Sequence, residues 1–271
     1  MKSEAALRQL LQRIDGRGYR AYKELRGSYT LPGDFALHVD HVQGDPFAAP
    51  SRVRLRASLE LAALPRPLFG GRTRRVALED FLARQVQDAA GRVGGRRGSG
   101  KSGLVGIDAG GQPVLERSAV RIGTDFVEAR LQVGLPAAGR RVLGREAEEL
   151  LVGDLAEIGS RALLYASLSS SEVGRFVECV ENHAALQEQL GAAGLVAVLA
   201  DGSVLPRESG ASERPLRRSV VPLEAPDSLR VTLEVPNPVP GPNGADTRQL
   251  AGLGVPEGVT LIVGGGYHGK S

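Results

Sequence analysis

The chain has 271 residues and a mass of 28.5 kDa, and its 42% hydrophobic content allows one or two domains with real cores and excludes wholesale disorder. Aromatic residues make up only 4% and tryptophan is absent, which requires an aliphatic core and argues against base stacking as the main means of holding single-stranded nucleic acid. The formal net charge is +3, and no run of about twenty apolar residues exists, so no segment is expected to span a membrane.

Helical and strand patterns alternate along the chain. Apolar residues recur at helical spacing in residues 4–14, whereas residues 52–61 alternate strictly, with arginines on the outer side. Ser169 and Glu172 form a capping box that starts a helix. The expected helices are 4–14, 19–25, 76–90, 144–167 and 169–190. The expected strands are 35–40, 52–61, 104–107, 114–116, 118–121, 126–133, 195–200, 229–235 and 259–263.

Basic residues are concentrated in residues 52–101. This segment contains twelve arginine and lysine side chains against four acidic ones, and twelve minus four leaves +8, so the remainder of the chain is net acidic. Such a concentration is the usual sign of a polyanion partner. An arginine-rich composition with solvated faces explains it equally well, so both interpretations stay open.

The single cysteine, Cys179, excludes an internal disulfide and fits a reducing cytoplasm. The sequence around it does not indicate an activated thiolate. His38 and His41 lie near two aspartates, but on an alternating strand they face opposite sides, so a polar hydrogen-bonding corner is favoured over a metal site. No G-x-S-x-G elbow of a serine hydrolase is present.

The pattern G-x-x-x-x-G-K-[ST], which is typical of phosphate loops, occurs twice. In such a loop successive backbone N–H groups surround the phosphates, the lysine meets the outer phosphates and the hydroxyl binds Mg²⁺. The second copy directly follows the apolar, β-branched segment 259–263, which predicts the buried strand that the loop requires. We therefore predict a site for ATP and Mg²⁺, with Ser271 as the metal ligand. Its residues are Gly264, Gly265, Gly266, Tyr267, His268, Gly269, Lys270 and Ser271.

The first copy, residues 95–102, lacks the strand-loop-helix context of a phosphate loop. This copy lies in the glycine- and arginine-rich loop 91–103, after a helical pattern that ends in glycines. A strand pattern follows the loop, so no helix N-terminus is available to add its dipole. A basic loop that contacts a nucleic-acid backbone is favoured over a second nucleotide site, with Arg96, Arg97 and Lys101 as its contacts. A plain solvated loop is the remaining alternative.

The sequence stops at Ser271, before the helix that a phosphate loop requires. On this interpretation the chain is the front portion of a longer ATP-using protein and contains no catalytic residue of its own. The terminal carboxylate would also stand where the phosphates and Mg²⁺ belong. The 271-residue chain alone is therefore not expected to hydrolyse ATP.

Several segments, in order and along nearly the whole chain, resemble the ABC-class ATPase family. One is His-Val-Asp-His-Val-Gln-Gly-Asp-Pro-Phe at 38–47, in which Asp-His-Val-Gln-Gly-Asp-Pro-Phe is not a generic motif. The others are Ile-Asp-Gly-Arg-Gly-Tyr-Arg-Ala-Tyr at 14–22, Gly-Ser-Gly-Lys-Ser-Gly at 98–103, Val-Gly-Leu-Pro at 133–136 with Gly-Arg-Arg at 139–141, Gly-Leu-Val-Ala at 194–197 with Ala-Asp-Gly-Ser-Val-Leu-Pro-Arg at 200–207, and the closing stretch 258–271.

The resemblance implies an α+β N-terminal region of the family's own type, residues 1–218, followed by the first strands of an α/β P-loop ATPase core of ABC type, residues 219–271. The boundary lies in the polar, basic linker 206–218. The resemblance also implies ATP and Mg²⁺ binding, pairing of two ATPase cores as a homodimer in the complete protein, and association with RNA or another nucleic acid. A basic RNA-binding module that does not depend on nucleotide, and a P-loop kinase, are the alternatives.

Overall fold

The computed structural model describes residues 1–204, 206–241 and 244–263, and the chain divides into two compact units, Met1–Val177 and Glu178–Ser271. The division lies inside helix α6 (Ser170–Leu190), earlier than the expected boundary after residue 218. The difference arises because strand β9 (Leu195–Ala200) pairs with strand β13 (Asp246–Pro256), which ties it to the second unit.

The first unit is built on one antiparallel sheet. Strands β1, β2, β3 and β6 lie side by side in that order, and β4 and β5 both pair with β6. A short hairpin of β7 and β8 follows β6. The strands are β1 (Gly27–Thr30), β2 (Ala36–His41), β3 (Ser51–Ser58), β4 (Val105–Gly106), β5 (Val120–Ile122), β6 (Phe126–Val133), β7 (Ala137–Ala138) and β8 (Arg141–Val142).

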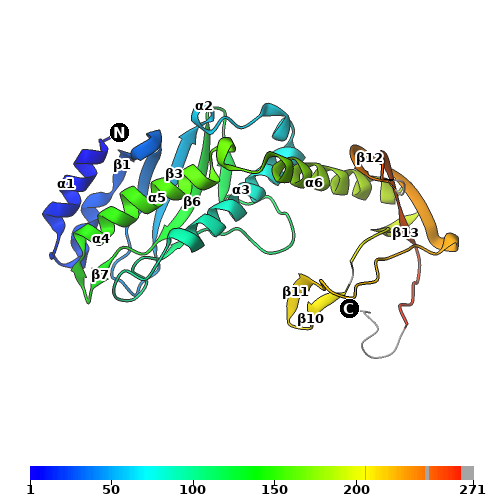
Figure 1. Ribbon diagram of the computed structural model, residues 1–271. Coiled ribbons are helices and arrows are strands. Elements are labelled where there is room, and N and C mark those ends of the chain that lie inside the picture. Colours follow the sequence, from blue (N-terminus) through cyan, green and yellow to red (C-terminus); the bar gives the residue numbers. More distant parts are fainter. Residues whose placement is uncertain (205, 242–243, 264–271) are drawn as a thin grey trace. The chain divides into compact units, whose positions relative to one another are not determined.

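Helices cover one face of this sheet, where α1, α3 and α5 lie in front of the strands (Figure 1). The alternation of β3 creates this face, since Val53, Leu55 and Ala57 are buried and the arginines between them point the other way. The helices are α1 (Glu4–Ile14), α2 (Leu59–Ala62), α3 (Arg72–Val93), α4 (Gly144–Glu148) and α5 (Leu155–Ala162). The π-helical segment is η4 (Glu149–Asp154), and the 3-10 turns are η1 (Tyr19–Leu25), η2 (Pro32–Asp34), η3 (Arg66–Leu68) and η5 (Tyr165–Ser167).

The opposite, polar face of the sheet is organised around Glu128 on β6. Its side chain is 2% exposed, and its oxygens accept hydrogen bonds from Arg54 at 3.1 Å, from Arg56 at 2.6 Å and from Arg130 at 3.3 Å. Burial raises the pKa of this carboxyl, but the bonds from Arg56 and Arg130 and the arginine charges outweigh it and hold the pKa below its usual value. Arg54 also pairs with Asp40 on β2 at 2.7 Å. The expected basic outer face of β3 is therefore present, but much of its charge is neutralised.

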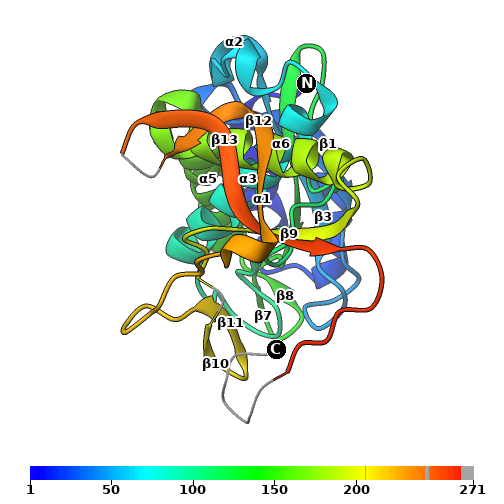
Figure 2. The same cartoon turned by 90° about the vertical axis from the view of Figure 1, so that its right-hand side faces the viewer.

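The second unit contains an antiparallel sheet in the order β12, β13, β9 and a separate hairpin of β10 and β11 (Figure 2). Strand β12 lies at the edge and carries three prolines, which an edge strand tolerates because it has free N–H positions. Asn182 of α6 exchanges hydrogen bonds with the Asn237 backbone at 3.2 and 2.9 Å, which joins the helix to β12. The remaining elements are β10 (Arg207–Ser209), β11 (Ser212–Pro215), η6 (Asp227–Leu229) and β12 (Arg230–Pro240).

Most expected elements are present, and the fold is a mixture of helices and sheets as predicted. Helix α6 begins at the expected cap, where the Glu172 N–H donates to Ser169 Oγ at 3.4 Å. The strand expected over 52–61 ends at Ser58, because the Ser58 hydroxyl accepts from Leu61 N at 3.0 Å and starts α2. The expected linker 206–218 contains the β10–β11 hairpin.

The apolar segment Val259–Val263 was expected to be a buried strand, and this expectation is wrong for the structure. These residues belong to no strand, and the side chains of Val259, Leu261, Ile262 and Val263 are 75–94% exposed. The physical reason is that no described segment pairs with them. A strand of this composition becomes buried only when neighbouring strands and helices cover it.

We predict that Glu128→Gln lowers the free energy of unfolding at pH 7 by about 2 kcal/mol, because three arginines lose their shared carboxylate. The folded pKa of Glu128 is depressed, so its stabilisation is complete above the unfolded pKa of about 4.3 and is lost as the pH falls through the lower folded value. Urea unfolding at pH 7 and in acid measures both effects. Glu60→Gln, at an exposed carboxylate, is the matched control. Equal effects of the two variants would contradict the prediction.

Candidate functional site

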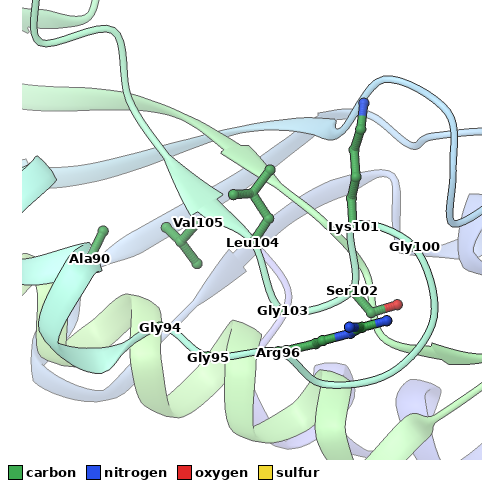
Figure 3. A pocket seen from close by; sticks show the side chains of 10 residues that line it. All are labelled: Ala90, Gly94, Gly95, Arg96, Gly100, Lys101, Ser102, Gly103, Leu104 and Val105. Carbon is green, nitrogen blue, oxygen red and sulfur yellow. The ribbon is translucent and has the colours of Figure 1, made fainter.

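The predicted phosphate loop, Gly264–Ser271, lies outside the described residues. The described site is therefore the first copy of the pattern, Gly95–Ser102, in the loop between α3 and β4 (Figure 3). A hollow of about 360 Å³ lies beside this loop. Its lining residues are Ala90, Gly94, Gly95, Arg96, Gly100, Lys101, Ser102, Gly103, Leu104 and Val105.

Backbone N–H groups of this loop are already bonded within the protein. Ser99 N donates to Ala137 O at 2.8 Å, Lys101 N to Pro46 O at 2.8 Å, and Gly103 N to Gly134 O at 2.8 Å. Arg97 N and Ser102 N donate to carbonyls of the loop itself, at 3.0 and 3.2 Å. A phosphate loop needs these donors free and converging on one point. Here they hold the loop to its neighbours.

The hydroxyl of Ser102 is also engaged. Ser102 is 3% exposed, its Oγ donates to Ser99 O at 2.5 Å, and it accepts from Ala137 N at 3.0 Å. This hydroxyl is therefore a structural link between two loops. The same position in a phosphate loop would face a metal ion.

The glycines of the copy serve loop packing. Gly100 has φ +63°, and a Cβ there would fall against the Pro46 carbonyl oxygen and within 3.1 Å of Phe47 Cδ1. Gly98 has φ +128°, and a Cβ there would fall against the Ala137 carbonyl oxygen. Only glycine permits both the conformation and the approach. The loop is followed by strand β4, so no helix dipole adds to it.

The three predicted nucleic-acid contacts have different surroundings. Arg97 is 17% exposed on its side chain and pairs with Glu149 at 3.1 Å and Asp154 at 2.7 Å. Burial raises the pKa of the Asp154 carboxyl, and the Arg97 charge opposes that rise. Arg96 and Lys101 are exposed, and they leave the loop in different directions (Figure 3). Among the described residues the Lys101 ammonium group has no hydrogen-bond or ion-pair partner. Their contact with nucleic acid stays a prediction.

Segments that were singled out separately in the sequence meet here. We call residues 42–50, 94–104 and 134–141 the three-loop cluster. Buried Gln43 joins its parts, because its Oε1 accepts from Ser51 N at 3.2 Å and from Leu135 N at 3.4 Å. The segment 14–22 is bonded to the third of these loops. The Tyr19 hydroxyl donates to Leu135 O at 3.1 Å, and the Tyr22 hydroxyl donates to Pro136 O at 2.6 Å. Sequence reasoning noted these segments but did not identify these bonding roles.

His38 lies among hydrogen-bonded polar groups. Its Nδ1 lies 2.7 Å from Ser28 Oγ, while Asp40 is paired with Arg54. Burial and the Arg54 and Arg56 charges lower the pKa of His38. Across the described ranges no three histidine, cysteine, aspartate or glutamate side chains gather in a way that could hold a metal ion.

The helices of the described residues are too short or too polar to cross a bilayer.

Two family models match the chain. Residues 4–166 match the family model described as "ATPase of the ABC class N-terminal". Residues 169–271 match the ABC ATPase family model described as "P-loop domain". The three-loop cluster lies within the first match, and Gly264–Ser271 lies within the second. No curated protein matches the chain.

We predict that Ser102→Ala lowers the free energy of unfolding by about 1–2 kcal/mol, because the buried Ala137 N–H loses its acceptor. Ser118→Ala, which removes an exposed hydroxyl in the same unit, should change stability by less than about 0.5 kcal/mol. Urea unfolding of both variants measures the difference. Wild-type stability in Ser102→Ala would show that the hydroxyl does not link the loops.

Proposed function

We propose that this chain, which belongs to the ABC-class ATPase family, binds ATP through Gly264–Ser271 and associates with RNA through its first unit. The P-loop domain match implies nucleotide binding, typically with Mg²⁺. The single observation that carries the assignment of this loop is the state of the other copy. In Gly95–Ser102 the amides of Ser99 and Lys101 donate to neighbouring loops, those of Arg97 and Ser102 donate within the loop, and the serine hydroxyl is bonded as well, which favours the second copy for the phosphates.

In this proposal the Ser271 hydroxyl would hold Mg²⁺ and Lys270 would meet the outer phosphates. Pairing of two ATPase cores around nucleotide, as the family resemblance implies, completes the proposal. Sedimentation of the full-length gene product with and without ATP tests the pairing, and a mass that never changes would contradict it. The lone Cys179 supports a reducing compartment, for which we propose the cytoplasm.

RNA association is supported by the cations of the three-loop cluster. Arg96, Lys101 and Arg140 are exposed, on loops that hydrogen bonds connect. Exposed cations held on a rigid base suit contact with a phosphate backbone regardless of base sequence. Arg97 is given no part in this proposal because Glu146, Glu149 and Asp154 pair with it. A basic RNA-binding module that works without nucleotide is the second candidate, and the variants below separate the two.

We predict that Lys270→Ala lowers ATP affinity at least about tenfold in the full-length gene product, since the outer phosphates lose a charge-assisted contact. Lys101→Ala is the matched control, because it changes the same position of the other copy, and it should leave ATP affinity unchanged. Equilibrium binding of labelled ATP measures both. If ATP still binds the Lys270→Ala variant and no longer binds the Lys101→Ala variant, the nucleotide site is the first copy and the proposed site is wrong.

We predict the opposite pattern for RNA. Lys101→Ala and Arg96→Ala should each weaken binding to a single-stranded RNA and reduce the slope of log affinity against log salt by about 0.7, the effect of losing one phosphate contact. Lys270→Ala should leave RNA affinity unchanged in the absence of ATP. Fluorescence anisotropy over a salt series measures both quantities. An unaltered salt slope in Lys101→Ala and Arg96→Ala would remove these residues from the RNA interface.

A further inference from the structure

Phe47 is held out of the core by a rigid turn. Its side chain is 64% exposed, and among the described residues it is the one aromatic side chain that is largely exposed. The Asp45 carboxylate accepts from Phe47 N at 2.8 Å and Ala48 N at 3.2 Å, while the neighbouring Pro46 is buried. An exposed ring on a fixed backbone loses little freedom when it meets a ligand.

The ring stands beside the loop that carries Lys101. Lys101 N donates to Pro46 O at 2.8 Å, which fixes the two loops together directly next to Phe47. A Cβ at Gly100 would lie 3.1 Å from Phe47 Cδ1, so the edge of the ring lies against this glycine. Lys101 extends away from the backbone of its loop (Figure 3). An aromatic ring and an unpaired ammonium group are thus held on adjoining loops.

Further cations border this pair. Gly139 N donates to Ser99 Oγ at 2.9 Å, which connects the turn before Arg140 to the same loop. Arg96 lies on that loop and its Nε donates to Gly98 O at 3.3 Å. The Oδ1 of Asp45, in the turn before Phe47, accepts two amides. The exposed side chains of Phe47, Arg96, Lys101 and Arg140, on loops that hydrogen bonds connect, therefore give this surface one ring and three positive charges.

We propose that this surface holds an unpaired nucleotide of single-stranded RNA, with the base stacked on the Phe47 ring and the adjoining phosphates contacted by Lys101, Arg96 and Arg140. The inference rests on the proposed RNA association and gives it a binding mode. A base within a duplex is covered on both faces, so only an unpaired base can stack on this ring. The phosphate contacts supply most of the affinity, and one ring adds a preference for single strands. This agrees with a chain so poor in aromatic residues.

The test compares Phe47→Ala with wild type in the full-length gene product, on a single-stranded RNA and on a duplex of the same length. Affinity for the single strand should fall by about 5- to 100-fold, the range for losing one stacked base. Affinity for the duplex and the salt slope should not change. Phe47→Tyr should retain wild-type binding. Leu115→Ala is the matched control, because it removes an exposed apolar side chain of the same unit outside the three-loop cluster.

A second readout uses the absence of tryptophan from the chain. Phe47→Trp places a single tryptophan among these 271 residues, and a base stacked on its indole should quench its fluorescence on addition of single-stranded RNA. Quenching by the single strand and none by the duplex supports the proposal. Bound RNA that leaves the fluorescence unchanged overturns it.

The outcomes separate the two levels of the argument. If wild type binds RNA and Phe47→Ala binds it equally well, the stacking mode is wrong while the RNA association stands. If Phe47→Ala loses duplex affinity as well, the ring does not act on unpaired bases and the stacking mode is again wrong. If wild type binds neither form of RNA, the proposed association itself fails.

Discussion

The three-loop cluster is held together by hydrogen bonds between its loops. The loop after α3 has few partners in regular structure, and buried amide groups without partners cost free energy. Carbonyls of Pro46, Gly134 and Ala137 meet this need, and the Ser102 hydroxyl adds an acceptor and a donor. Three distant stretches of chain thereby become one surface. The same bonds engage the N–H groups of Ser99, Lys101 and Gly103, which are then not free to surround a phosphate.

Charge counted along the chain differs from charge in space. The basic segment 52–101 draws several of its counterions from outside itself, since Asp40 and Glu128 pair with Arg54, and Glu149 and Asp154 pair with Arg97. The excess left for a partner is therefore smaller and more localised than the sequence indicates. The remaining positive charge lies on exposed side chains such as Lys101, which forms no ion pair with a described acidic residue. Neighbouring cations on one loop thus differ in their surroundings, since Arg97 is paired with acids and Lys101 keeps its charge exposed.

Local signals explain which parts could be predicted. The amphipathic spacing of residues 4–14 predicts helix α1, and the serine cap at Ser169 predicts where α6 begins. Strand β13 was missed because its residues lack clear alternation and depend on pairing with two neighbours, and β12 continues through a proline-rich stretch that looks like a loop. The two glycine-lysine patterns were ranked by their flanking elements, yet the loop contacts of Gly100 and Ser102 could not be foreseen. They arise from tertiary contacts that spacing does not encode.

The exposed thiol of Cys179 on α6 has a practical consequence. Because the 271 residues contain a single cysteine, a maleimide dye or spin label will attach at one defined position, without mutagenesis. That position lies two residues beyond the division between the compact units, on the helix that both of them share. The same exposure makes the thiol accessible to air oxidation. Purified protein kept without a reductant is therefore expected to form disulfide-linked dimers as an artefact of handling.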